Sequence, residues 1–568
     1  MTLTENGTSD YVIVRSANAV ASEKRAAEEL QSYILQISGV NLPIVSDNSD
    51  TTKKEIVVGK TNRPCDTLID RTALGDDGFR IVVNDKTLLI AGGQERGTLY
   101  GVYSFLEEYL GCRWFTSTVE YVPQIKTIVI PKDTDNSQTP AFMLRDTSWY
   151  CSFDSTWREK QKINFKMLNW NNISSDYTKF VTFAGPVGHT LNYFVPKEEY
   201  YETHPEYFMI DVNGERRNAQ PCLSNPDVLK LVKQGVKRLI EENPDATLFS
   251  VGQNDGGDWE QYCHCPACAA ITKEEGSFSG NVIRFVNEVA EYAKTIRKDV
   301  KIHTFAYQYT QIPPKITHPV DNVLVQLCAI NCNHADIYEN TDKAFCDDLK
   351  GWSAICKNLF IWDYTTNFNH YLTPVPDFGL HQKNMQLFRD NNAVSMFMQG
   401  NSQSINGEFG ELRAYIFAKL MWNPDCDLEK VTDEFMLGYY GAGYKNIKKY
   451  MNILESRKSD LFKIATAPEN IINLSLPDLI LCDNLWDAAE KAAADDAQLA
   501  RIKRSRLQLQ YYKSVAQKAE FTVINPLREK SAETLYHSIV DSGITWIQER
   551  KQLTKNPDFS KKASTWSE

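Results

Sequence analysis

The sequence has 568 residues, of which 42% are hydrophobic and 24% charged, a composition typical of folded globular proteins. Its length predicts two to four domains. The formal net charge of −11 gives no basic surface for a nucleic-acid backbone, so we expect no nucleic-acid partner. No run approaches the roughly 18 apolar residues of a membrane span, so we expect no membrane insertion. The first residues lack a basic segment before an apolar run, so we expect an export signal to be absent or removed.

Residues 1–138 alternate strand and helix patterns, which predicts a small N-terminal α/β domain. A strand at 11–14 precedes a helical pattern that stops at Gly39, and another strand is expected at 56–58. The segment FRIVVNDKTLLIAG alternates apolar residues around Asn84-Asp85 and predicts a hairpin, which an amphipathic helix follows. We expect this domain to pack against the rest of the chain and to contribute no catalytic residue.

Residues 139–425 contain eight apolar runs of strand length, most of them followed by a helical pattern. This pattern predicts a central (β/α)8 TIM-like barrel. The runs lie at 142–144, 164–168, 181–184, 247–251, 300–306, 322–327, 358–362 and 393–398. The third unit is the weakest, because a long polar insertion at 185–225 follows it. Barrels of this class carry their chemistry at the carboxyl ends of the strands.

Polar and aromatic residues follow the eight runs, as expected for a site that stacks sugar faces on rings and bonds sugar hydroxyl groups. The candidates for substrate contact are Arg145, Trp149, Trp170, His189, Asn254, Tyr307, Trp362, Asp363, Tyr364 and Asn369. No glycine-rich phosphate loop with its lysine is present, which argues against a phosphate pocket. We expect neither a cofactor nor a catalytic metal.

Asp255, which follows the fourth run in GQNDGGD, is the strongest catalytic candidate. Glycoside hydrolysis needs a carboxylic acid that protonates the leaving oxygen and a second group that stabilises or attacks the anomeric carbon. Many glycosidase barrels place the acid at the end of strand four, and Asp255 fits that place. The alternative is a turn in which the Asn254 and Asp255 side chains bond backbone amides.

Glu408 is the candidate for the second catalytic carboxylate. It precedes the helical segment GELRAYIFAKLMW, where Glu411 is expected to be structural because the helix dipole favours acidic residues in a first turn. We therefore expect Glu408 to face the cleft. For Asp363, between Trp362 and Tyr364, a role in orienting a substrate amide and a role as a structural anchor both stay open.

His189 lies in the long insertion, in GPVGHTLNYFVP. A lone histidine is usually a structural residue. A long loop over a barrel mouth, however, usually shapes a subsite.

Thirteen cysteines are too few for a disulfide scaffold, and the odd number prevents complete pairing within the chain. The cluster Cys263-His264-Cys265-Pro-Ala-Cys268 offers three thiolates and an imidazole for zinc. Its spacing departs from paired C-x-x-C motifs, and a second pair is missing nearby. We expect a structural loop or a disulfide rather than a metal site.

Residues 426–568 have a helical pattern and are expected to form a C-terminal helical region on the barrel flank, with a polar tail after Leu553. We expect no catalytic residue in this region.

The run LLIAGGQERGTLYGVYSFLEEYLGCRWF resembles the small α/β domain that precedes the catalytic barrel in bacterial β-hexosaminidases and α-glucuronidases. Most of residues 140–430 resemble glycoside hydrolase family 163, formerly a family of unknown function. The resembling segments are GHTLNYFVP, HPEYFMIDVNGERR, QPCLSNPDV, SVGQNDGGDWEQYCHCPAC, FAYQYTQIPP, IWDYTTNF and GEFGELRAYIFAKLMWNPDCD.

This resemblance implies an endo-β-N-acetylglucosaminidase that cuts the GlcNAc-β1,4-GlcNAc core of complex N-glycans on glycoproteins, with retention. It also implies export to the periplasm or the outer-membrane surface, and we expect a monomer. Substrate-assisted hexosaminidases carry a closely spaced acidic pair at strand four, whereas this chain has Asn254-Asp255 and then Asp258. The nucleophile, an enzyme carboxylate or the substrate acetamido group, therefore stays open.

Two other hypotheses are kept. An exo-acting α-glucuronidase would share the first domain and need a basic pocket, for which Arg145 is the main candidate. A glycan-binding protein on an inactive barrel would bind sugar without turnover.

Overall fold

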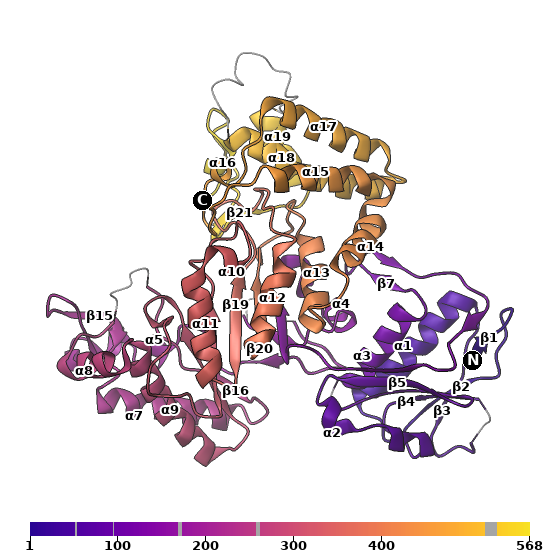
Figure 1. Cartoon of the computed structure of the whole chain (residues 1–568), viewed down its shortest axis with the longest axis horizontal. Helices are drawn as coiled ribbons and strands as arrows, with labels where there is room; N and C mark the ends of the chain where they lie inside the picture. Colours follow the sequence, from indigo (N-terminus) through magenta and orange to yellow (C-terminus); the bar gives the residue numbers. More distant parts are fainter. Residues whose placement is uncertain (52–53, 95, 169–172, 257–261, 517–530) are drawn as a thin grey trace.

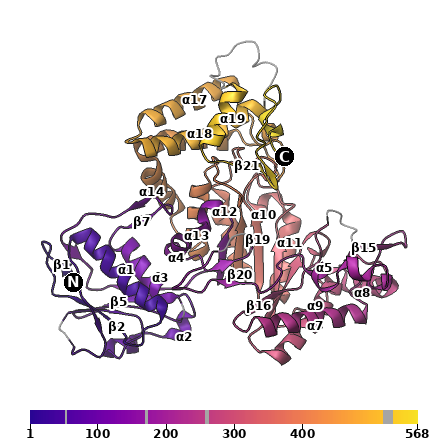
Figure 2. The same cartoon turned by 180° about the vertical axis from the view of Figure 1, so that it is seen from behind.

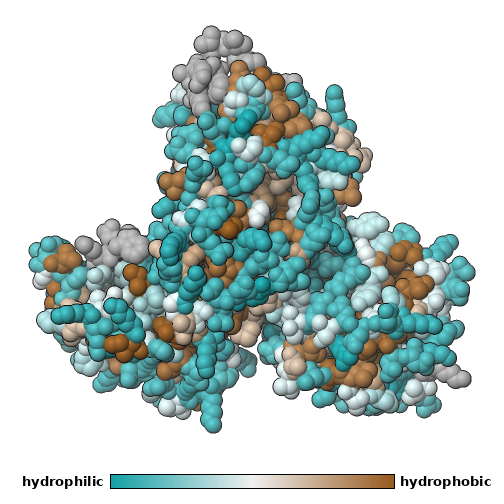
Figure 3. Space-filling view, in the orientation of Figure 1, coloured by the Kyte–Doolittle hydropathy of each residue, from teal (hydrophilic) through white to brown (hydrophobic). Residues whose placement is uncertain are grey.

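The computed structural model describes residues 1–51, 54–94, 96–168, 173–256, 262–516 and 531–568. Figure 1 shows a central barrel with the N-terminal α/β domain on one side and the insertion after the third barrel strand on the other. The C-terminal helices lie above the barrel, and Figure 2 shows the same arrangement from behind. The face seen in Figure 3 is largely hydrophilic, with small separate hydrophobic patches.

The N-terminal domain is built on a six-stranded sheet of order β10-β5-β6-β4-β2-β3. Because side chains alternate along a strand, one face of this sheet packs on α1 and α3 and the other on η1 and α2. The elements of this region are β1 Thr2–Thr4, β2 Val12–Arg15, α1 Ala21–Ser38, β3 Ile44–Ser46, β4 Glu55–Val58, η1 Pro64–Leu68, α2 Arg71–Leu74, β5 Phe79–Asn84, β6 Thr87–Gly92, α3 Gly97–Glu108, β7 Arg113–Trp114, β8 Glu120–Tyr121, β9 Ile128–Val129 and β10 Asp135–Gln138.

Two local predictions in this domain are confirmed. Helix α1 ends at Gly39, which has the left-handed φ of 78° that a residue without a Cβ adopts at little cost. Strands β5 and β6 pair antiparallel around a turn in which Asp85 has a φ of 53°.

The predicted TIM-like barrel is confirmed, and each of the eight apolar runs overlaps a strand, although the first run shares only Leu144 with its strand. Six strands form one parallel sheet of order β11-β20-β19-β18-β17-β16, a half-barrel. Strands β12 and β13 form a separate parallel pair, joined to β16 by one bridge between Phe183 and Leu248. The strands are β11 Leu144–Thr147, β12 Phe165–Lys166, β13 Val181–Thr182, β16 Leu248–Ser250, β17 Lys301–Ala306, β18 Val323–Cys328, β19 Leu359–Tyr364 and β20 Ala393–Gln399.

Helices connect most of these strands, but in the described residues no α-helix follows β12 or β17 before the next strand. The insertion after β13 holds short helices and a hairpin, β14–β15. The connecting elements are η2 Tyr150–Phe153, α4 Ser155–Lys160, α5 Leu191–Phe194, α6 Lys197–Tyr200, η3 Pro205–Tyr207, β14 Phe208–Ile210, β15 Arg216–Pro221, α7 Pro226–Glu242, α8 Pro266–Glu275, α9 Ser279–Ile296, η4 Gln308–Thr310, α10 Tyr338–Thr341, α11 Lys343–Ile355, α12 Leu380–Asp390 and α13 Gly410–Trp422.

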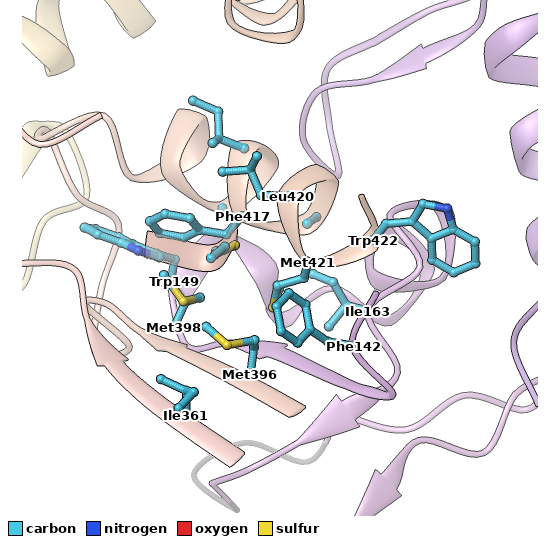
Figure 4. Packing of buried hydrophobic residues seen from close by; sticks show 14 of the residues in the cluster. Phe142, Trp149, Ile163, Ile361, Met396, Met398, Phe417, Leu420, Met421 and Trp422 are labelled. Carbon is cyan, nitrogen blue, oxygen red and sulfur yellow. The ribbon is translucent and has the colours of Figure 1, made fainter. Parts of the chain in front are cut away.

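Alternation along the barrel strands separates two cores. The barrel interior is filled by a cluster with one parity, formed by Phe165, Met167, Phe183, Leu248, Leu324, Phe360 and Phe397. Residues of the other parity, such as Met396 and Met398 on β20, face the outer helices. Figure 4 shows Phe417 and Met421 of α13 on the side of the sheet that carries these methionines, with Phe417 beside Trp149 and Met421 beside Phe142. The direction of a strand residue is therefore fixed by its parity.

The C-terminal region is mainly helical, as predicted, and its helices are followed by the hairpin β21–β22 and the short helix η7. Ala563 and Trp566 are fully buried in a core with residues of α18 and α19, so the predicted tail is wrong. The elements are α14 Leu428–Tyr440, η5 Gly441–Gly443, α15 Tyr444–Ser456, α16 Pro468–Ile471, α17 Leu476–Lys491, α18 Asp496–Val515, α19 Ala532–Asp541, β21 Trp546–Gln548, β22 Lys551–Gln552 and η7 Ala563–Thr565. In the described part of the chain, no helix is long and apolar enough to cross a membrane.

Candidate active site

A pocket of about 400 Å³ lies at the carboxyl ends of the barrel strands. This is the end at which TIM barrels carry their chemistry. Its lining comes from the ends of seven barrel strands and the loops after them, and from two C-terminal segments: Leu168, Val187, Gly188, His189, Asp255, Phe305, Tyr307, Cys328, Ile330, Trp362, Tyr364, Phe368, Asn369, Gln399, Ile464, Ala465, Glu549 and Arg550. Six of the predicted site residues meet here: His189, Asp255, Tyr307, Trp362, Tyr364 and Asn369.

The floor of the pocket is aromatic because the alternate residues of β17 and β19 that face the barrel interior have aromatic side chains. On β19, Trp362 and Tyr364 share the inward parity of Phe360, and their rings stack with centroids 5.9 Å apart. The indole Nε1 of Trp362 donates to Gln399 Oε1 at 2.8 Å, which fixes the ring plane. Tyr307 continues the inward side of β17. Flat rings with fixed orientations suit the C–H faces of a sugar.

Asp255 is directed at this floor. Its side chain is 56% exposed, and its Oδ1 accepts a hydrogen bond from Tyr307 Oη at 3.3 Å. Burial and the neighbouring Asp255 charge raise the pKa of Tyr307, so this phenol stays a proton donor. His189 Nε2 lies 3.7 Å from the same carboxylate oxygen.

Asn254 lies next to Asp255 in the chain but outside the pocket lining, which corrects its prediction as a substrate contact. Its side chain accepts from the Asn192 backbone N–H at 2.8 Å and donates to the Ala219 carbonyl at 2.9 Å. The Asn254 side chain therefore bonds backbone groups, as the alternative turn interpretation expected. These bonds connect the segment that carries Asp255 to the insertion.

Glu549 brings a second carboxylate into the pocket. It lies in the turn between β21 and β22, where Arg550 adopts a left-handed φ of 61°. The Glu549 N–H donates to the Phe368 carbonyl at 2.8 Å, and the Arg550 N–H donates to Gln403 Oε1 at 3.1 Å. These bonds hold the turn on the loops that follow β19 and β20.

The pKa of Glu549 is raised from its ordinary value. Burial is the main cause, the positive charge of Arg550 opposes it, and the negative charge of Asp255 adds to it. The pocket therefore holds two carboxylates that interact electrostatically, beside one guanidinium.

Glu408 does not line this pocket, and the prediction that it faces the cleft is wrong. It is fully buried and accepts two hydrogen bonds from Arg413, both of 2.8 Å, while Arg413 also donates to Asp377 at 2.6 Å. Burial raises the pKa of Glu408 to about 7, against the opposing charge of Arg413. One guanidinium thus serves two carboxylates, and this cluster anchors the start of α13 to the loop before α12.

Asp363 is also turned away from the pocket, which corrects its predicted substrate contact. It has the outward parity of β19 and accepts from Tyr338 Oη of α10 at 2.6 Å. Its side chain is fully buried between the strand and the helix layer. Of the two roles left open by the sequence, the structure supports the structural anchor.

Arg145 and Trp149 are likewise structural. Arg145 points outward from β11, is buried, and donates to Asp77 of the N-terminal domain at 2.6 Å. Trp149 is buried, and its indole Nε1 donates to Thr365 Oγ1 at 3.1 Å. The predicted contacts of both residues with substrate are wrong. Trp170 and Asp258 lie outside the described residues.

A larger cavity of about 870 Å³ lies where the N-terminal domain meets the barrel and α14. Its charged lining is occupied by ion pairs, including Arg113 with Glu434 at 2.9 Å and Lys419 with Glu107. None of the candidate site residues lines it. The described side chains that are grouped tightly enough to hold a metal are four cysteines, none of which lines the smaller pocket.

Two family models match the chain. One, described as "Domain of unknown function (DUF4838)", matches residues 114–452, and one described as "Glycosyl hydrolase family 67 N-terminus" matches residues 5–105. Among curated proteins, the probable alpha-glucuronidase A of Aspergillus fumigatus is 34% identical over 84 residues, 14% of this chain. That of Neosartorya fischeri is 36% identical over 84 residues. The chain spans 10% of the length of these curated relatives.

Solved glycoside hydrolases have the same fold at low identity. A family GH115 4-O-methyl-α-glucuronidase with specificity for decorated arabinogalactans matches with a TM-score of 0.55 and 12% identity, over 95% of this chain and 76% of that one. A family 89 glycoside hydrolase from Clostridium perfringens, in complex with PUGNAc, matches with a TM-score of 0.52 and 11% identity, over 92% of this chain and 66% of that one. The chain thus has a glycoside-hydrolase-like fold.

Proposed function

We propose that this chain, which belongs to the DUF4838 family, is a glycoside hydrolase whose active site is the pocket around Asp255 and Glu549. The observation that carries the proposal is the meeting of two interacting carboxylates above an aromatic floor at the carboxyl ends of the barrel strands. Glycosidases use such a pair for acid catalysis and for stabilising an oxocarbenium-like transition state.

Asp255 is proposed as the general acid. It follows strand β16, the fourth strand of the barrel, and it is partly exposed, so a leaving glycosidic oxygen can reach it from the open side. Tyr307 and His189 contact its Oδ1 and limit the rotation of the carboxyl group. A fixed acid saves the orientational entropy that a free acid would lose in the transition state.

Glu549 is proposed as the second carboxylate, which acts in its ionised form. Its negative charge would stabilise positive charge at the anomeric centre or hold the N–H of a substrate acetamido group as its oxygen attacks. The two options differ in the nucleophile, and both need the Glu549 charge. Arg550 opposes the effect of burial on the Glu549 pKa and so favours the ionised form.

For the substrate, we propose complex N-glycans cut between the two core N-acetylglucosamine residues. The motifs that resemble family 163 supply eight of the 18 residues that line the pocket. Among them, GHTLNYFVP carries His189, the QNDGG segment carries Asp255, and IWDYTTNF carries Trp362 and Tyr364. An acetamido methyl group is apolar and suits the rings of Tyr307 and Trp362. Export to the periplasm or cell surface, and a monomeric state, belong to the same proposal.

Mass spectrometry of a complex N-glycoprotein before and after incubation tests this proposal. Endo cleavage leaves a single N-acetylglucosamine on asparagine and releases a glycan that lacks one N-acetylglucosamine. The control variant for substitution of Asp255 is Asp363→Asn. Asp363 is an outward-facing carboxylate on the same barrel, so this variant should retain cleavage. An unchanged glycoprotein contradicts the endo activity.

A second candidate is an exo-acting α-glucuronidase. It is favoured by Arg550, a guanidinium in the pocket lining that suits a uronate carboxylate, and by the match of residues 5–105 to the family 67 N-terminus. Arg145, the earlier candidate for that role, is paired with Asp77. Release of uronic acid from a glucuronoxylan, lost in Arg550→Gln, would support this candidate. Sugar binding without any turnover would instead indicate an inactive barrel.

A further inference from the structure

Four cysteines from two distant segments meet beside the insertion hairpin. Cys222 directly follows the end of β15, and Cys263, Cys265 and Cys268 surround the start of α8. All four sulfur atoms lie within 4.8 Å of one another. Cys222 Sγ is 3.7 Å from Cys265 Sγ and 3.9 Å from Cys268 Sγ.

These separations fit a tetrahedral metal site. With a Zn–S bond of about 2.3 Å, the sulfur atoms of a ZnS4 tetrahedron lie about 3.8 Å apart. A disulfide instead requires a sulfur separation of about 2.05 Å. All thirteen cysteines are unpaired in the structure, so the disulfide that the sequence suggested is not formed.

The surroundings of the sulfurs suit thiolates. Cys263 Sγ accepts from the Ile210 N–H and Cys265 Sγ from the Cys268 N–H, each at 3.5 Å. Ser224 Oγ lies between 3.2 and 3.4 Å from three of the four sulfurs. The start of α8 adds the positive end of a helix dipole. Such outer contacts orient and stabilise metal-bound thiolates.

We propose that Cys222, Cys263, Cys265 and Cys268 bind one zinc ion in a structural site. Thiolate ligands favour zinc over magnesium or calcium, and four protein ligands leave no open position for a substrate. Three of the cysteines are buried and Cys265 is half-buried, as in a closed site. His264, the nitrogen ligand considered from the sequence, instead stacks on Tyr262 with ring centroids 4.4 Å apart.

The zinc joins the hairpin β14–β15 to α8 next to the segment that carries Asp255. The His264 N–H donates to the Ile210 carbonyl of β14 at 2.7 Å. On β15, the Gln220 side chain accepts from the Asn254 N–H at 2.9 Å and donates to the Asn254 carbonyl at 2.8 Å. The ion therefore fixes the end of β15, and Gln220 on the same strand holds Asn254. This structural role does not depend on which reaction Asp255 serves.

The test is the metal content of the full chain, purified in reducing buffer without chelator and measured by inductively coupled plasma mass spectrometry. We expect one zinc ion per chain, released when the thiols are modified. Growth with cobalt should give the ligand-field absorption of a tetrahedral cobalt thiolate. Cys222→Ser and Cys268→Ser should lose the metal, whereas Cys65→Ser, at a half-buried cysteine of the N-terminal domain, should keep it.

The wild-type measurements decide the proposal even if the cysteine variants fail to fold. A chain that holds no zinc and takes up no cobalt would overturn it. A second result would also overturn the proposal: an intact mass four hydrogen atoms below that of the fully reduced chain, with none of the four cysteines alkylated in the native protein. Two disulfides would then replace the metal site.

Discussion

His189 lies with its Nε2 atom 3.7 Å from Asp255 Oδ1 and its Nδ1 atom 2.6 Å from the Gln253 carbonyl oxygen. A carbonyl only accepts hydrogen bonds, so Nδ1 carries a hydrogen atom. The Nδ1 hydrogen bond fixes the plane of the imidazole, so Nε2 stays directed at Asp255 Oδ1. On the proposed mechanism, this contact helps to hold the Asp255 carboxyl group in place at the open side of the pocket.

Replacing Asp255 with Asn removes the proton donor of the proposed mechanism. We expect kcat/KM on an unactivated glycan to fall by about 10²–10⁴-fold, the usual contribution of a general acid. An aryl glycoside with a good leaving group needs little protonation, so its hydrolysis should fall much less. Comparing the two substrates in steady-state kinetics checks the role. Equal losses on both substrates would assign Asp255 to binding instead.

The pH profile should respond to Arg550. On the proposed mechanism Glu549 acts in its ionised form, so activity should fall as the pH drops through its pKa, which is already raised by burial. Arg550→Gln removes the charge that lowers this pKa, so the acid limb of the kcat/KM profile should move to higher pH. Arg217→Gln, at an exposed arginine on β15, serves as the control and should leave the limb in place. If Arg550→Gln left the acid limb of the kcat/KM profile in place, Glu549 would not be the group whose ionisation controls activity.

Glu408 should matter for stability rather than for chemistry. Glu408→Ala leaves Arg413 buried with one carboxylate fewer, and we expect the free energy of unfolding to fall by about 3–5 kcal/mol. Glu408→Gln keeps the shape and one acceptor, so it should cost less and retain kcat in the folded enzyme. Urea denaturation and assays below the transition check both outcomes. A folded Glu408→Gln variant without turnover would restore the catalytic role predicted from the sequence.

Gly400 should tolerate no side chain. A Cβ atom there would lie 2.2 Å from the Trp149 indole, whose ring is held by Thr365. We expect Gly400→Ala to lower the free energy of unfolding by about 1–3 kcal/mol through overpacking. At Gly379 a Cβ meets nothing within 4 Å and φ is −72°, so Gly379→Ala should be neutral or slightly stabilising. Thermal or urea unfolding of the pair gives the comparison.

The barrel could be predicted because its strands are contiguous apolar runs, which local sequence displays directly. Strand parity, counted from Phe360, could also have turned Asp363 outward. The pairing of Arg145 with Asp77 is less accessible, because the partner lies in another domain and no spacing connects the two.

Glu408 and Glu549 show the limit of reasoning from local sequence. Glu408 is withdrawn from the cleft by Arg413 and Asp377, a cluster that only tertiary folding assembles. Glu549 enters the pocket on a two-residue turn far from the barrel in the chain. The local segment WIQERKQ has two adjacent apolar residues followed by five polar ones and no glycine or asparagine turn signal, so it predicts neither the hairpin nor its place.

The hairpin β21–β22 brings Glu549 to a barrel whose strands were all completed about 150 residues earlier in the chain. During synthesis from the N-terminus, Asp255 and the aromatic floor therefore leave the ribosome well before the second carboxylate exists. On the proposed mechanism, a nascent barrel can bind sugar and still be unable to cleave it. On this mechanism, hydrolysis begins only when this later-made turn docks on the loops after β19 and β20, so the order of synthesis itself separates folding from activity.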